Sequence, residues 1–298
     1  MADRDAKVCL TFDFDAISVW PGALGMTSPS AVSRGEFSGR VGVPRVLNVL
    51  KREGVSATFF VPGITVEAWP DLCRRMLDEG HEIGHHGYHH ITPVTLEEAA
   101  ERDQLEKGLE AIDRVLDGHR AVGYRSPGAD LSPNSTRLLA ENGFIYESSM
   151  SAQDFEPYWC RTGDVIEPSG VATFGPEVEL LEIPFSWTLD DFPQMEFVLT
   201  PNGVFLEGLS DPEKCERMWL ADLDYMVEEI PGGVYTMCFH PEIIGRGARV
   251  RVLERMIARG KEHGAQFMTA RAAAEDWISR HPFDRLAGPG GEPMSVQP

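Results

Sequence analysis

Short apolar runs alternate with segments of helical periodicity along most of the chain. The runs are rich in β-branched and aromatic residues and have the length of buried strands. They predict strands at residues 7–14, 57–62, 82–86, 122–126, 145–150, 178–187, 234–240 and 265–268. Amphipathic segments, several of them closed by a glycine, predict helices at residues 44–53, 66–79, 95–116, 135–142, 213–229, 250–263 and 270–280. In the third of these helices, Thr95 is the expected N-cap and Glu98 its capping-box partner.

This alternation is typical of βα units built around a parallel sheet. It predicts a single irregular or incomplete (β/α) barrel of the TIM type with about seven parallel strands. A doubly wound open sheet is the alternative, but it usually carries a glycine-rich turn where this chain has Thr-Phe-Asp-Phe-Asp. We expect one domain over residues 1–281 and a loose Gly/Pro-rich tail over residues 282–298. Two long loops, residues 16–42 and 151–177, are expected to carry function or oligomer contacts.

The composition limits the partners that the protein can bind. Lys and Arg number 27 against 47 Asp and Glu, and the net charge of −20 repels a phosphate backbone or an anionic membrane surface. No run of the chain approaches the roughly 18 apolar residues that span a bilayer. The N-terminal segment has no apolar signal-peptide core, and the five cysteines include no CxxC pair. We therefore expect a cytoplasmic protein that binds neither nucleic acid nor membrane.

Two carboxylates mark the end of the first predicted strand. Asp13 and Asp15 are two residues apart, so that they share one face of the strand. Two like charges aimed at one place need a cation or a shared proton. A loop-starting aspartate beside a helix cap is the structural alternative, and it explains one of the two carboxylates but not both.

The segment HEIGHHGYHH, residues 81–90, holds five of the nine histidines. Three pairs have the spacing that a helical turn brings together: His81/His85, His85/His89 and His86/His90. Gly84 and Gly87 disfavour a continuous helix, which weakens the first two pairs and leaves His86 and His90. Two imidazoles and one carboxylate suit Zn²⁺ or another first-row metal with positions open for water, and the second carboxylate can then act as a base. A solvated, histidine-rich loop is the alternative.

Two further polar residues follow predicted strands. Arg125 precedes a Pro-Gly turn, and His240 ends an apolar run. Taken singly, each has an ordinary explanation as a surface arginine or a satisfied buried histidine. Together with Asp13, Asp15 and His86, however, they all fall at the carboxyl ends of predicted parallel strands, where barrel enzymes build their active sites. These residues predict a metal-activated hydrolase.

The same motifs resemble those of the polysaccharide deacetylase superfamily, which is defined by the NodB homology domain. The likeness extends from about Val8 to Ala274. The residues similar to the first, second, third and fifth family motifs are 11–16, 84–90, 125–128 and 239–241. In place of the fourth motif, residues 185–191 hold a tryptophan and two aspartates in a different order.

The resemblance implies a NodB-like barrel and a role for each matched residue. The metal ligands would be Asp15, His86 and His90, holding one divalent cation, with Zn²⁺ the expected metal. Asp13 would be the base, His240 the acid that protonates the departing nitrogen, and Arg125 the cation that keeps Asp13 ionised. Trp187 would form an apolar wall of the substrate pocket, and Asp190 or Asp191 would orient His240 or Arg125. The remaining histidines, His81, His85 and His89, would have supporting, pocket-lining or surface positions.

One residue separates Asp13 from Asp15, as in a subgroup that includes peptidoglycan-deacetylase-like proteins, cyclic imide hydrolases and allantoinase-like enzymes. Members of this subgroup often lack a signal peptide, assemble as tetramers and carry a long first loop similar to residues 33–42. The resemblance therefore implies a homo-oligomer, with the tetramer as its expected form. The metal-independent allantoinase-like members lack the metal-binding set that this chain keeps, which favours a metal-dependent mechanism.

Three functions fit these observations. The first is a metal-dependent hydrolase of non-peptide C–N bonds that acts on a small amide or imide; the charge and the missing signal peptide favour such a small cytoplasmic substrate. The second is a deacetylase of N-acetylated sugars or peptidoglycan. The third, of another class, is a non-catalytic relative that binds metal or ligand; it should lack the base or the acid, whereas Asp13 and His240 are both present.

Overall fold

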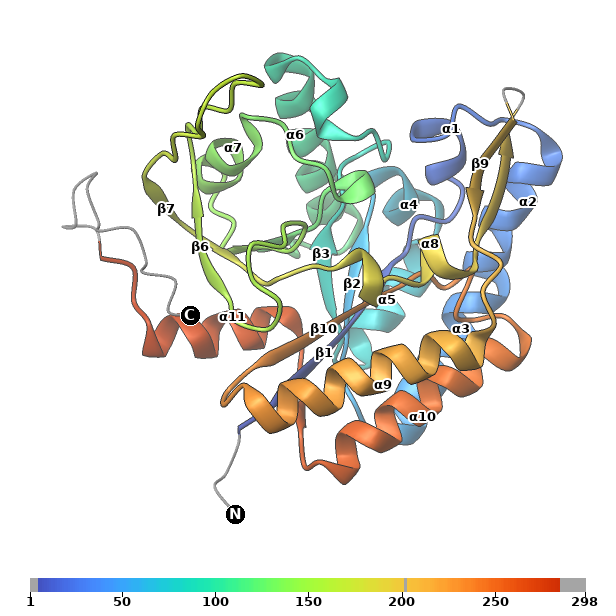
Figure 1. Cartoon of the computed structure of the whole chain (residues 1–298). Helices are drawn as coiled ribbons and strands as arrows, with labels where there is room; N and C mark the ends of the chain where they lie inside the picture. The colour runs from blue at the N-terminus through green and yellow to red at the C-terminus, as the bar shows by residue number, and fades with distance from the viewer. Residues whose placement is uncertain (1–4, 201–202, 285–298) are drawn as a thin grey trace.

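The structure, a computed structural model, describes residues 5–200 and 203–284. Its main sheet consists of β1 (Lys7–Asp13), β2 (Thr58–Val61), β3 (Glu82–His85), β4 (Gly123–Tyr124), β5 (Tyr146–Glu147), β6 (Tyr158–Arg161), β7 (Glu177–Glu182), β10 (Val234–Phe239) and β11 (Gln266–Phe267). The strand order is β10-β1-β2-β3-β4-β5-β7-β6, and β11 pairs with the start of β1 (Figure 1).

The sheet is a curled half-barrel. The seven strands from β10 to β7 are parallel to their neighbours, and β6 alone runs antiparallel to β7. Within the described residues β6 does not pair with β10, so the sheet stays open at that side. The predicted irregular barrel with about seven parallel strands is therefore confirmed.

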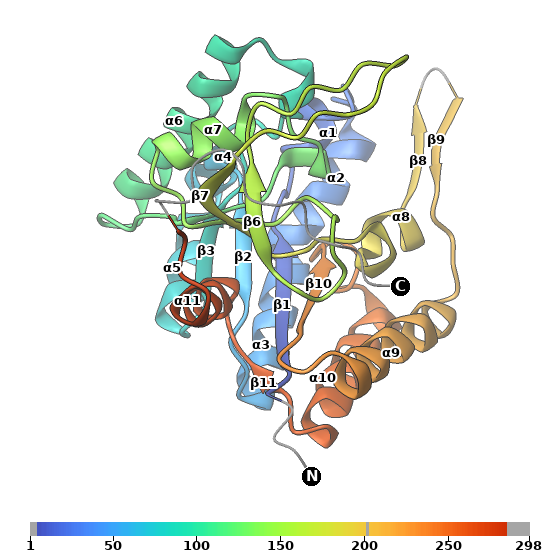
Figure 2. The same cartoon turned by 60° about the vertical axis from the view of Figure 1, so that its left-hand side comes forward.

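Helices surround the strands, as Figure 2 shows. They are α1 (Val19–Gly22), α2 (Pro29–Phe37), α3 (Val43–Glu53), α4 (Gly63–Ala68), α5 (Pro70–Asp78), α6 (Glu98–Val115), α7 (Ser135–Glu141), α8 (Asp191–Met195), α9 (Pro212–Glu229), α10 (Val250–Glu262) and α11 (Ala270–Arg280). Shorter turns are η1 (Ser38–Gly42), η2 (Pro93–Thr95), η3 (Pro127–Ala129), η4 (Trp187–Leu189) and η5 (Gly247–Arg249). Helices α9, α10, α3, α5, α4 and α6 contact one another in that order, forming an outer wall of the half-barrel.

Strand β1 lies at the centre of the core. All seven of its residues are buried, because helices cover one side of the sheet and the interior of the half-barrel the other. The ring of Phe12 lies 5.0 Å from that of Phe59 on β2 and 5.7 Å from that of Phe239 on β10. This packing explains the mostly apolar residues in front of Asp13 and fixes where that carboxylate leaves the sheet.

The expected helix over residues 66–79 is wrong, since the segment forms two helices, α4 and α5. Trp69, with φ −130°, lies between them, and Pro70 occupies the first turn of α5. A proline has no backbone N–H to donate and disfavours helical geometry in the residue before it. The break lets α4 pack against α6 while α5 packs against β3 and α3.

The capping box expected at Thr95 is also wrong. Thr95 belongs to η2, where its hydroxyl donates to the carbonyl of Thr92 at 2.7 Å. Helix α6 begins at Glu98 after Glu97, whose side chain makes no capping hydrogen bond. A hydroxyl can bond a nearby carbonyl as readily as a helix N-terminus, and here the local turn is favoured.

The two long loops contain ordered structure. Residues 16–42 form α1, α2 and η1, and residues 151–177 include β6. The strand expected over residues 178–187 ends at Glu182, and Trp187 begins η4. Of the expected tail, residues 285–298 lie outside the described part of the chain.

A hairpin of β8 (Phe197–Thr200) and β9 (Gly203–Glu207) was not predicted. It lies beside the first loop (Figure 1). Arg34 of α2 donates to the carbonyl of Phe197 at 2.7 Å and forms an ion pair with Glu196. The guanidinium of Arg34 also lies over the ring of the buried Trp20, 4.4 Å from its centroid. The loop and the hairpin thus pack together above the sheet.

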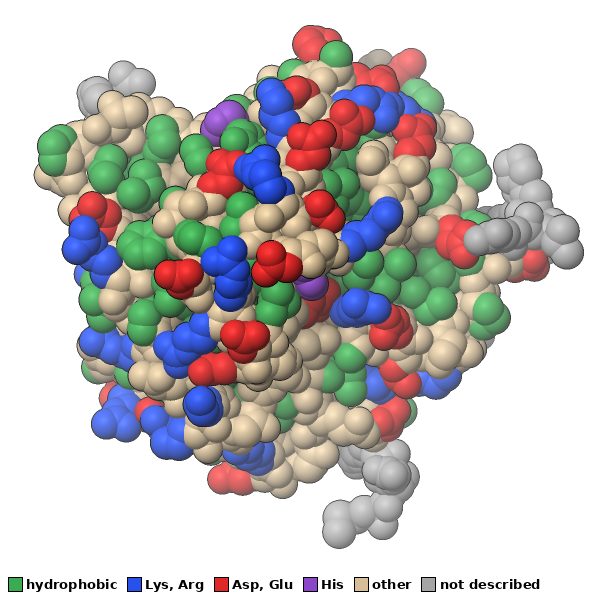
Figure 3. All heavy atoms as spheres, turned by 180° about the vertical axis from the view of Figure 1, so that it is seen from behind, with side chains coloured by type: hydrophobic (Ala, Val, Ile, Leu, Met, Phe, Trp, Pro, Cys, Tyr) green, Lys and Arg blue, Asp and Glu red, His purple; other side chains and the backbone are tan. Residues whose placement is uncertain are grey.

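The surface shown in Figure 3 mixes acidic and basic side chains, with hydrophobic side chains grouped between them. This face has no continuous basic surface of the kind that binds a nucleic-acid backbone. In the described part of the chain, no helix is long and apolar enough to cross a membrane.

Candidate active site

The carboxyl ends of four parallel strands bring the predicted residues to one edge of the sheet. Asp13 ends β1, His86 follows β3, Arg125 follows β4, and His240 follows β10. The register places Phe12 beside Phe239 and His85 beside Tyr124, so the residues that follow each pair emerge together. Asp15, two residues beyond β1, lies in the same group.

Asp15, His86 and His90 form a buried trio with the donor set of a metal site. Nε2 of His86 lies 3.4 Å from one Asp15 carboxylate oxygen, and Nε2 of His90 lies 3.4 Å from the other. One ligand atom of each residue lies within 4.8 Å of the other two. Burial opposes the negative charge of Asp15, but the two imidazoles outweigh it and lower its pKa below the usual range.

Two further observations fit a divalent cation at this trio. Nδ1 of His86 lies 2.7 Å from the carbonyl oxygen of Arg125, which makes it the donor and leaves the Nε2 lone pair directed toward Asp15. Oδ1 of Asp15 is buried and has no hydrogen-bond partner among the described residues. A bound cation would satisfy both atoms.

The two histidines do not meet on a helical turn, contrary to expectation. Gly87 has φ +69° and His90 has φ +59°, so the chain between them folds through left-handed conformations. The amide of Gly87 donates to Nδ1 of His85 at 3.1 Å, and its carbonyl accepts from the amide of Gly63 at 3.0 Å. A Cβ on Gly87 would lie 3.0 Å from the ring of Pro127, so both φ and space favour glycine there.

The other three histidines of the segment lie outside the trio. His85 is fully buried with Nε2 3.0 Å from the carbonyl of Leu105, and burial lowers its pKa to about 3, so it is neutral. A Cβ on Gly108 would lie 2.1 Å from this ring, which shows how closely α6 packs on it. His81 accepts a backbone hydrogen bond at 3.2 Å, and His89 is exposed.

Asp13 forms a buried ion pair with Arg125. One guanidinium nitrogen lies 2.9 Å from the Asp13 carboxylate and 2.6 Å from the hydroxyl of Thr11. Another donates to the carbonyl of Ser148 at 2.9 Å. Burial opposes the charge of Arg125, but Asp13 outweighs it and raises its pKa further. The other Asp13 oxygen faces the trio, 3.9 Å from Nε2 of His86.

His240 is held by two neighbouring carboxylates. Oδ1 of Asp191 lies 2.9 Å from both Nδ1 and the backbone nitrogen of His240, while the nearest Asp190 oxygen is 3.6 Å from Nδ1. Burial opposes protonation, but Asp190 and Asp191 raise the pKa of His240 well above its ordinary value. Nε2 points the other way, 3.8 Å from Asp15 and 4.0 Å from Asp13.

The two aspartates have different partners. Asp191 is fully buried and orients His240, whereas Asp190 also caps α8 by accepting from the amide of Phe192 at 2.7 Å. Burial raises the pKa of Asp190 to about 7. No hydrogen bond joins either aspartate to Arg125 among the described residues, whereas Asp191 accepts from His240.

Two other groups of possible metal ligands share His240. They are Asp13–Cys238–His240 and Asp190–Asp191–His240. Both use atoms that already have partners, since Asp13 pairs with Arg125 and Nδ1 of His240 with Asp191. Burial also raises the pKa of Cys238 well above its ordinary value, so it stays a thiol and a weak ligand. The Asp15 trio is therefore the better cation site.

A cavity of about 450 Å³ opens above these residues, a volume typical of small-molecule sites. Its floor carries the trio with Asp13 and His240, and half-exposed Trp187 is part of its wall. The first loop and the β8–β9 hairpin form other parts of the wall. The unusual length of residues 16–42 indicated that this loop carries function or oligomer contacts. The hairpin contributes Phe205 and Leu206, whose place in the cavity no local sequence pattern predicts.

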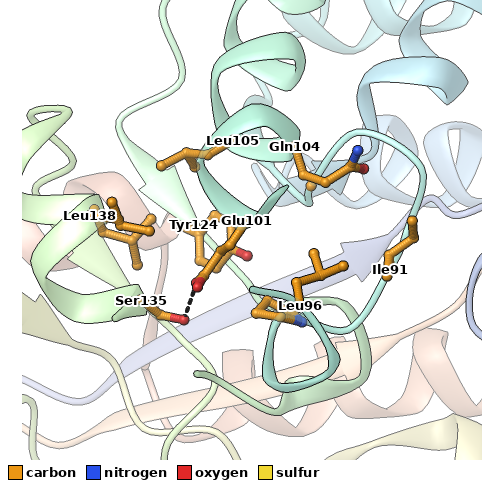
Figure 4. A pocket seen from close by; sticks show the side chains of 11 residues that line it. Ile91, Leu96, Glu101, Gln104, Leu105, Tyr124, Ser135 and Leu138 are labelled. Carbon is orange, nitrogen blue, oxygen red and sulfur yellow. Dashed lines mark hydrogen bonds between the residues drawn. The ribbon is translucent and has the colours of Figure 1, made fainter. Parts of the chain in front are cut away.

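A second cavity, beneath α6, is much smaller at about 10 Å³, roughly the room for one water. Figure 4 shows Glu101 directed toward Ser135, from which it accepts a hydrogen bond. Glu101 also accepts from Ser132 at 2.5 Å, so this buried carboxylate has two hydroxyl partners. These hydrogen bonds give the small cavity a structural explanation, as a gap beside the contact between α6 and α7.

Comparisons with known proteins found similar sequences and structures. Residues 2–146 match the family described as polysaccharide deacetylase. The chain is 34% identical over 291 residues to the peptidoglycan deacetylase of Helicobacter pylori, covering 94% of this chain and 98% of that protein. It is similar to the solved structure of a "putative polysaccharide deacetylase" from Mycobacterium smegmatis, with 32% identity and a TM-score of 0.78 over 94% and 93% of the two chains. A solved allantoinase shares the fold, with a TM-score of 0.75 at 22% identity over 95% and 94% of the chains.

Proposed function

Because this chain belongs to the polysaccharide deacetylase family, we propose that it is a metal-dependent hydrolase of non-peptide C–N bonds acting on a small amide or imide. The observation that carries the proposal is the buried trio of Asp15, His86 and His90 at the floor of a cavity of about 450 Å³. The donor set suits Zn²⁺.

A divalent cation at the trio would supply Lewis acidity and an activated water. Asp13 is placed to accept the proton of that water, since one of its oxygens faces the trio and the other is held by Arg125 at 2.9 Å. The guanidinium holds one Asp13 oxygen and leaves the other directed toward the trio. Arg125 itself is buried behind Asp13, so its role is to position that residue.

His240 is placed to give a proton to the departing nitrogen. Asp191 accepts the Nδ1 hydrogen at 2.9 Å, which fixes the ring and directs Nε2 into the cavity. The pKa of His240, raised by Asp190 and Asp191, keeps the ring protonated until the C–N bond breaks. The sum of these steps is the addition of water across the bond, giving a carboxylic acid and an amine or amide.

The shape of the cavity supports a small substrate. Residues 16–42 and the β8–β9 hairpin rise on the same side of the floor and contact each other through Arg34. A polymer needs a groove that continues past the reacting sugar. These two segments border the cavity on one side and leave less room for such a groove there. The test is turnover of succinimide, dihydrouracil-like imides and N-acetylglucosamine oligomers by the metal-loaded protein. Turnover of the oligomers alone would overturn the small-substrate proposal.

A deacetylase of peptidoglycan or N-acetylated sugars is the second candidate. It is favoured by the Helicobacter pylori relative, which is named as a peptidoglycan deacetylase. A non-catalytic relative is disfavoured because the base, the acid and the metal trio are all present in one cavity. Measuring bound metal and then assaying Asp13→Asn separates the classes: full activity in the variant would remove Asp13 from the mechanism.

Zn²⁺ as the metal, a cytoplasmic location, the absence of a nucleic-acid partner and a homo-oligomeric assembly stay predictions of the sequence. Elemental analysis of the purified protein and light scattering on a sizing column would measure the first and the last.

A further inference from the structure

The cavity has a polar floor and mostly apolar walls. Carboxylates and imidazoles occupy the floor around the trio, and the walls include two hydroxyl side chains, Thr92 and Ser126. The walls come from three separate segments: Leu24 of the first loop, Phe185 and Phe192 of the segment around η4, and Phe205 and Leu206 of the hairpin. Three segments that are separate in the sequence each place apolar side chains in this cavity. The apolar lining is therefore a property of the cavity and not of one element.

Apart from His240 on the floor, the charged side chains that line the cavity are acidic. Among the described residues that line it there is no lysine or arginine, whereas Asp13, Asp15 and Asp190 are all present. Arg125, the nearest guanidinium, is 1% exposed and lies behind Asp13, where it also binds Thr11. A negatively charged substituent on a bound substrate would therefore find no cation on the walls.

We propose that the substrate is an uncharged amide or imide bearing an apolar group, which packs against the aromatic and aliphatic walls while its carbonyl lies over the trio. This inference rests on the proposed hydrolase function and adds the substrate class. A hydroxyl-rich or anionic substituent would lose its water against Phe185, Phe192 and Phe205 and gain no partner there. An apolar substituent would lose nothing and cover exposed ring surface.

Phe205 is the wall residue best suited to a test. It lines the cavity yet is 66% exposed, so its ring has apolar surface left for a ligand to cover. Its neighbour Val204 on β9 is 49% exposed and does not line the cavity. The pair provides a wall variant and a matched control in the same hairpin, and neither side chain is needed for the buried core.

The experiment compares three imides with the metal-loaded full chain: succinimide, phenylsuccinimide and the analogue with a para-carboxylate on the phenyl ring. We expect kcat/KM for phenylsuccinimide to exceed that for the carboxylate analogue by about tenfold or more, the discrimination that apolar pockets commonly reach. Phe205→Ser should lower the ratio of phenylsuccinimide to succinimide about tenfold, mainly through KM. Phe205→Lys should shift preference toward the carboxylate, and Val204→Ser should keep the wild-type ratios.

Several results would overturn the inference. One is equal or faster turnover of the carboxylate analogue; another is a Phe205→Ser variant that keeps the wild-type ratio. Hydrolysis of N-acetylglucosamine oligomers without any imide would overturn it while leaving a metal-dependent hydrolase. Failure to hydrolyse any of these compounds would instead overturn the proposed function, and the inference with it.

Discussion

Replacing Asp191 with asparagine should keep the shape of the acid site and remove its charge. Oδ1 of Asp191 accepts from Nδ1 and from the backbone N–H of His240, each at 2.9 Å, and an asparagine oxygen can accept both bonds. Asp191 is fully buried, so solvent screens the lost charge little. Asp190 remains, but its oxygen is 3.6 Å from Nδ1.

The expected loss follows from the kind of hydrogen bond. A bond to a charged group contributes about 1.5–3 kcal/mol and a neutral one about 0.5–1.5 kcal/mol, so the protonated form of His240 should lose roughly 1.3 kcal/mol of stabilisation in the variant. The pKa of His240 should therefore fall, because one of the two carboxylates that raise it is neutralised. On the alkaline side of the pH–rate profile the protonated fraction of His240 should be about tenfold lower, and kcat should fall with it if proton donation limits the rate.

The assay uses two acetamides that differ in their need for an acid. Acetylated benzylamine releases a basic amine that must be protonated, whereas acetylated nitroaniline releases an amine that departs readily without a proton. On the alkaline limb of the pH–rate profile, Asp191→Asn should lower kcat about tenfold for the first and much less for the second, with bound metal unchanged. The alkaline limb of the pH–rate profile should move to lower pH, because the protonated form of His240 is lost earlier.

Asp190→Asn is the matched comparison. It keeps the α8 cap and neutralises the more distant carboxylate, so its effect on the benzylamide should be smaller. An equal fall for both acetamides in Asp191→Asn, or an alkaline limb that does not move, would refute the assignment of His240 as the acid oriented by Asp191.

Three further predictions concern stability. Asp13→Asn leaves the 1%-exposed Arg125 without its counter-ion. The unfolding free energy measured in urea should therefore fall by about 3–5 kcal/mol. Adding Arg125→Met should recover stability without activity, and a double variant no more stable than the single one would contradict the ion-pair argument. Metal at about 100 times its Kd should stabilise the wild type by about 2.7 kcal/mol. Asp15→Ala should show no metal-dependent shift of Tm. A shift preserved in that variant would exclude the trio as the metal site. Burial and the adjacent Glu147 raise the pKa of Glu182 well above 4.5, so the folded state keeps a proton that the unfolded chain releases and stability falls as pH rises above that value. Glu182→Gln should reduce this fall between about pH 5 and 8 in urea titrations, and an unchanged slope would assign it to other groups.

The strand ends of the site were predictable because their signals are local. An apolar run followed by a polar residue marks Asp13, Arg125 and His240, and parallel pairing then gathers them at one edge. Gly84 and Gly87 reduced the histidine segment to His86 and His90, which lie together beside Asp15, although the turn between them is left-handed rather than helical.

The elements that the sequence did not predict depend on distant contacts. The β8–β9 hairpin is tied to the fold by Arg34, more than 160 residues earlier, and no local pattern reports that contact. The choice of Asp191 over Asp190 as the partner of His240 is likewise decided where α8 meets β10. The capping prediction at Thr95 was wrong for the opposite reason, because a local contact decides it. The Thr95 hydroxyl bonds a carbonyl three residues away instead of capping α6.

The pairing of β1 with β10 has a consequence for biosynthesis. Residues from Lys7↔Val234 to Phe12↔Phe239 are joined across more than 220 positions of chain, while Asp15, His86 and His90 all lie within the first hundred. On the ribosome the proposed metal trio is therefore complete long before the proposed acid, His240, has been made. Contacts of such long sequence separation form late, so the nascent chain should acquire its metal-binding side chains first and its proton donor only when β10 docks. Catalytic competence would then arrive as one of the last events of folding.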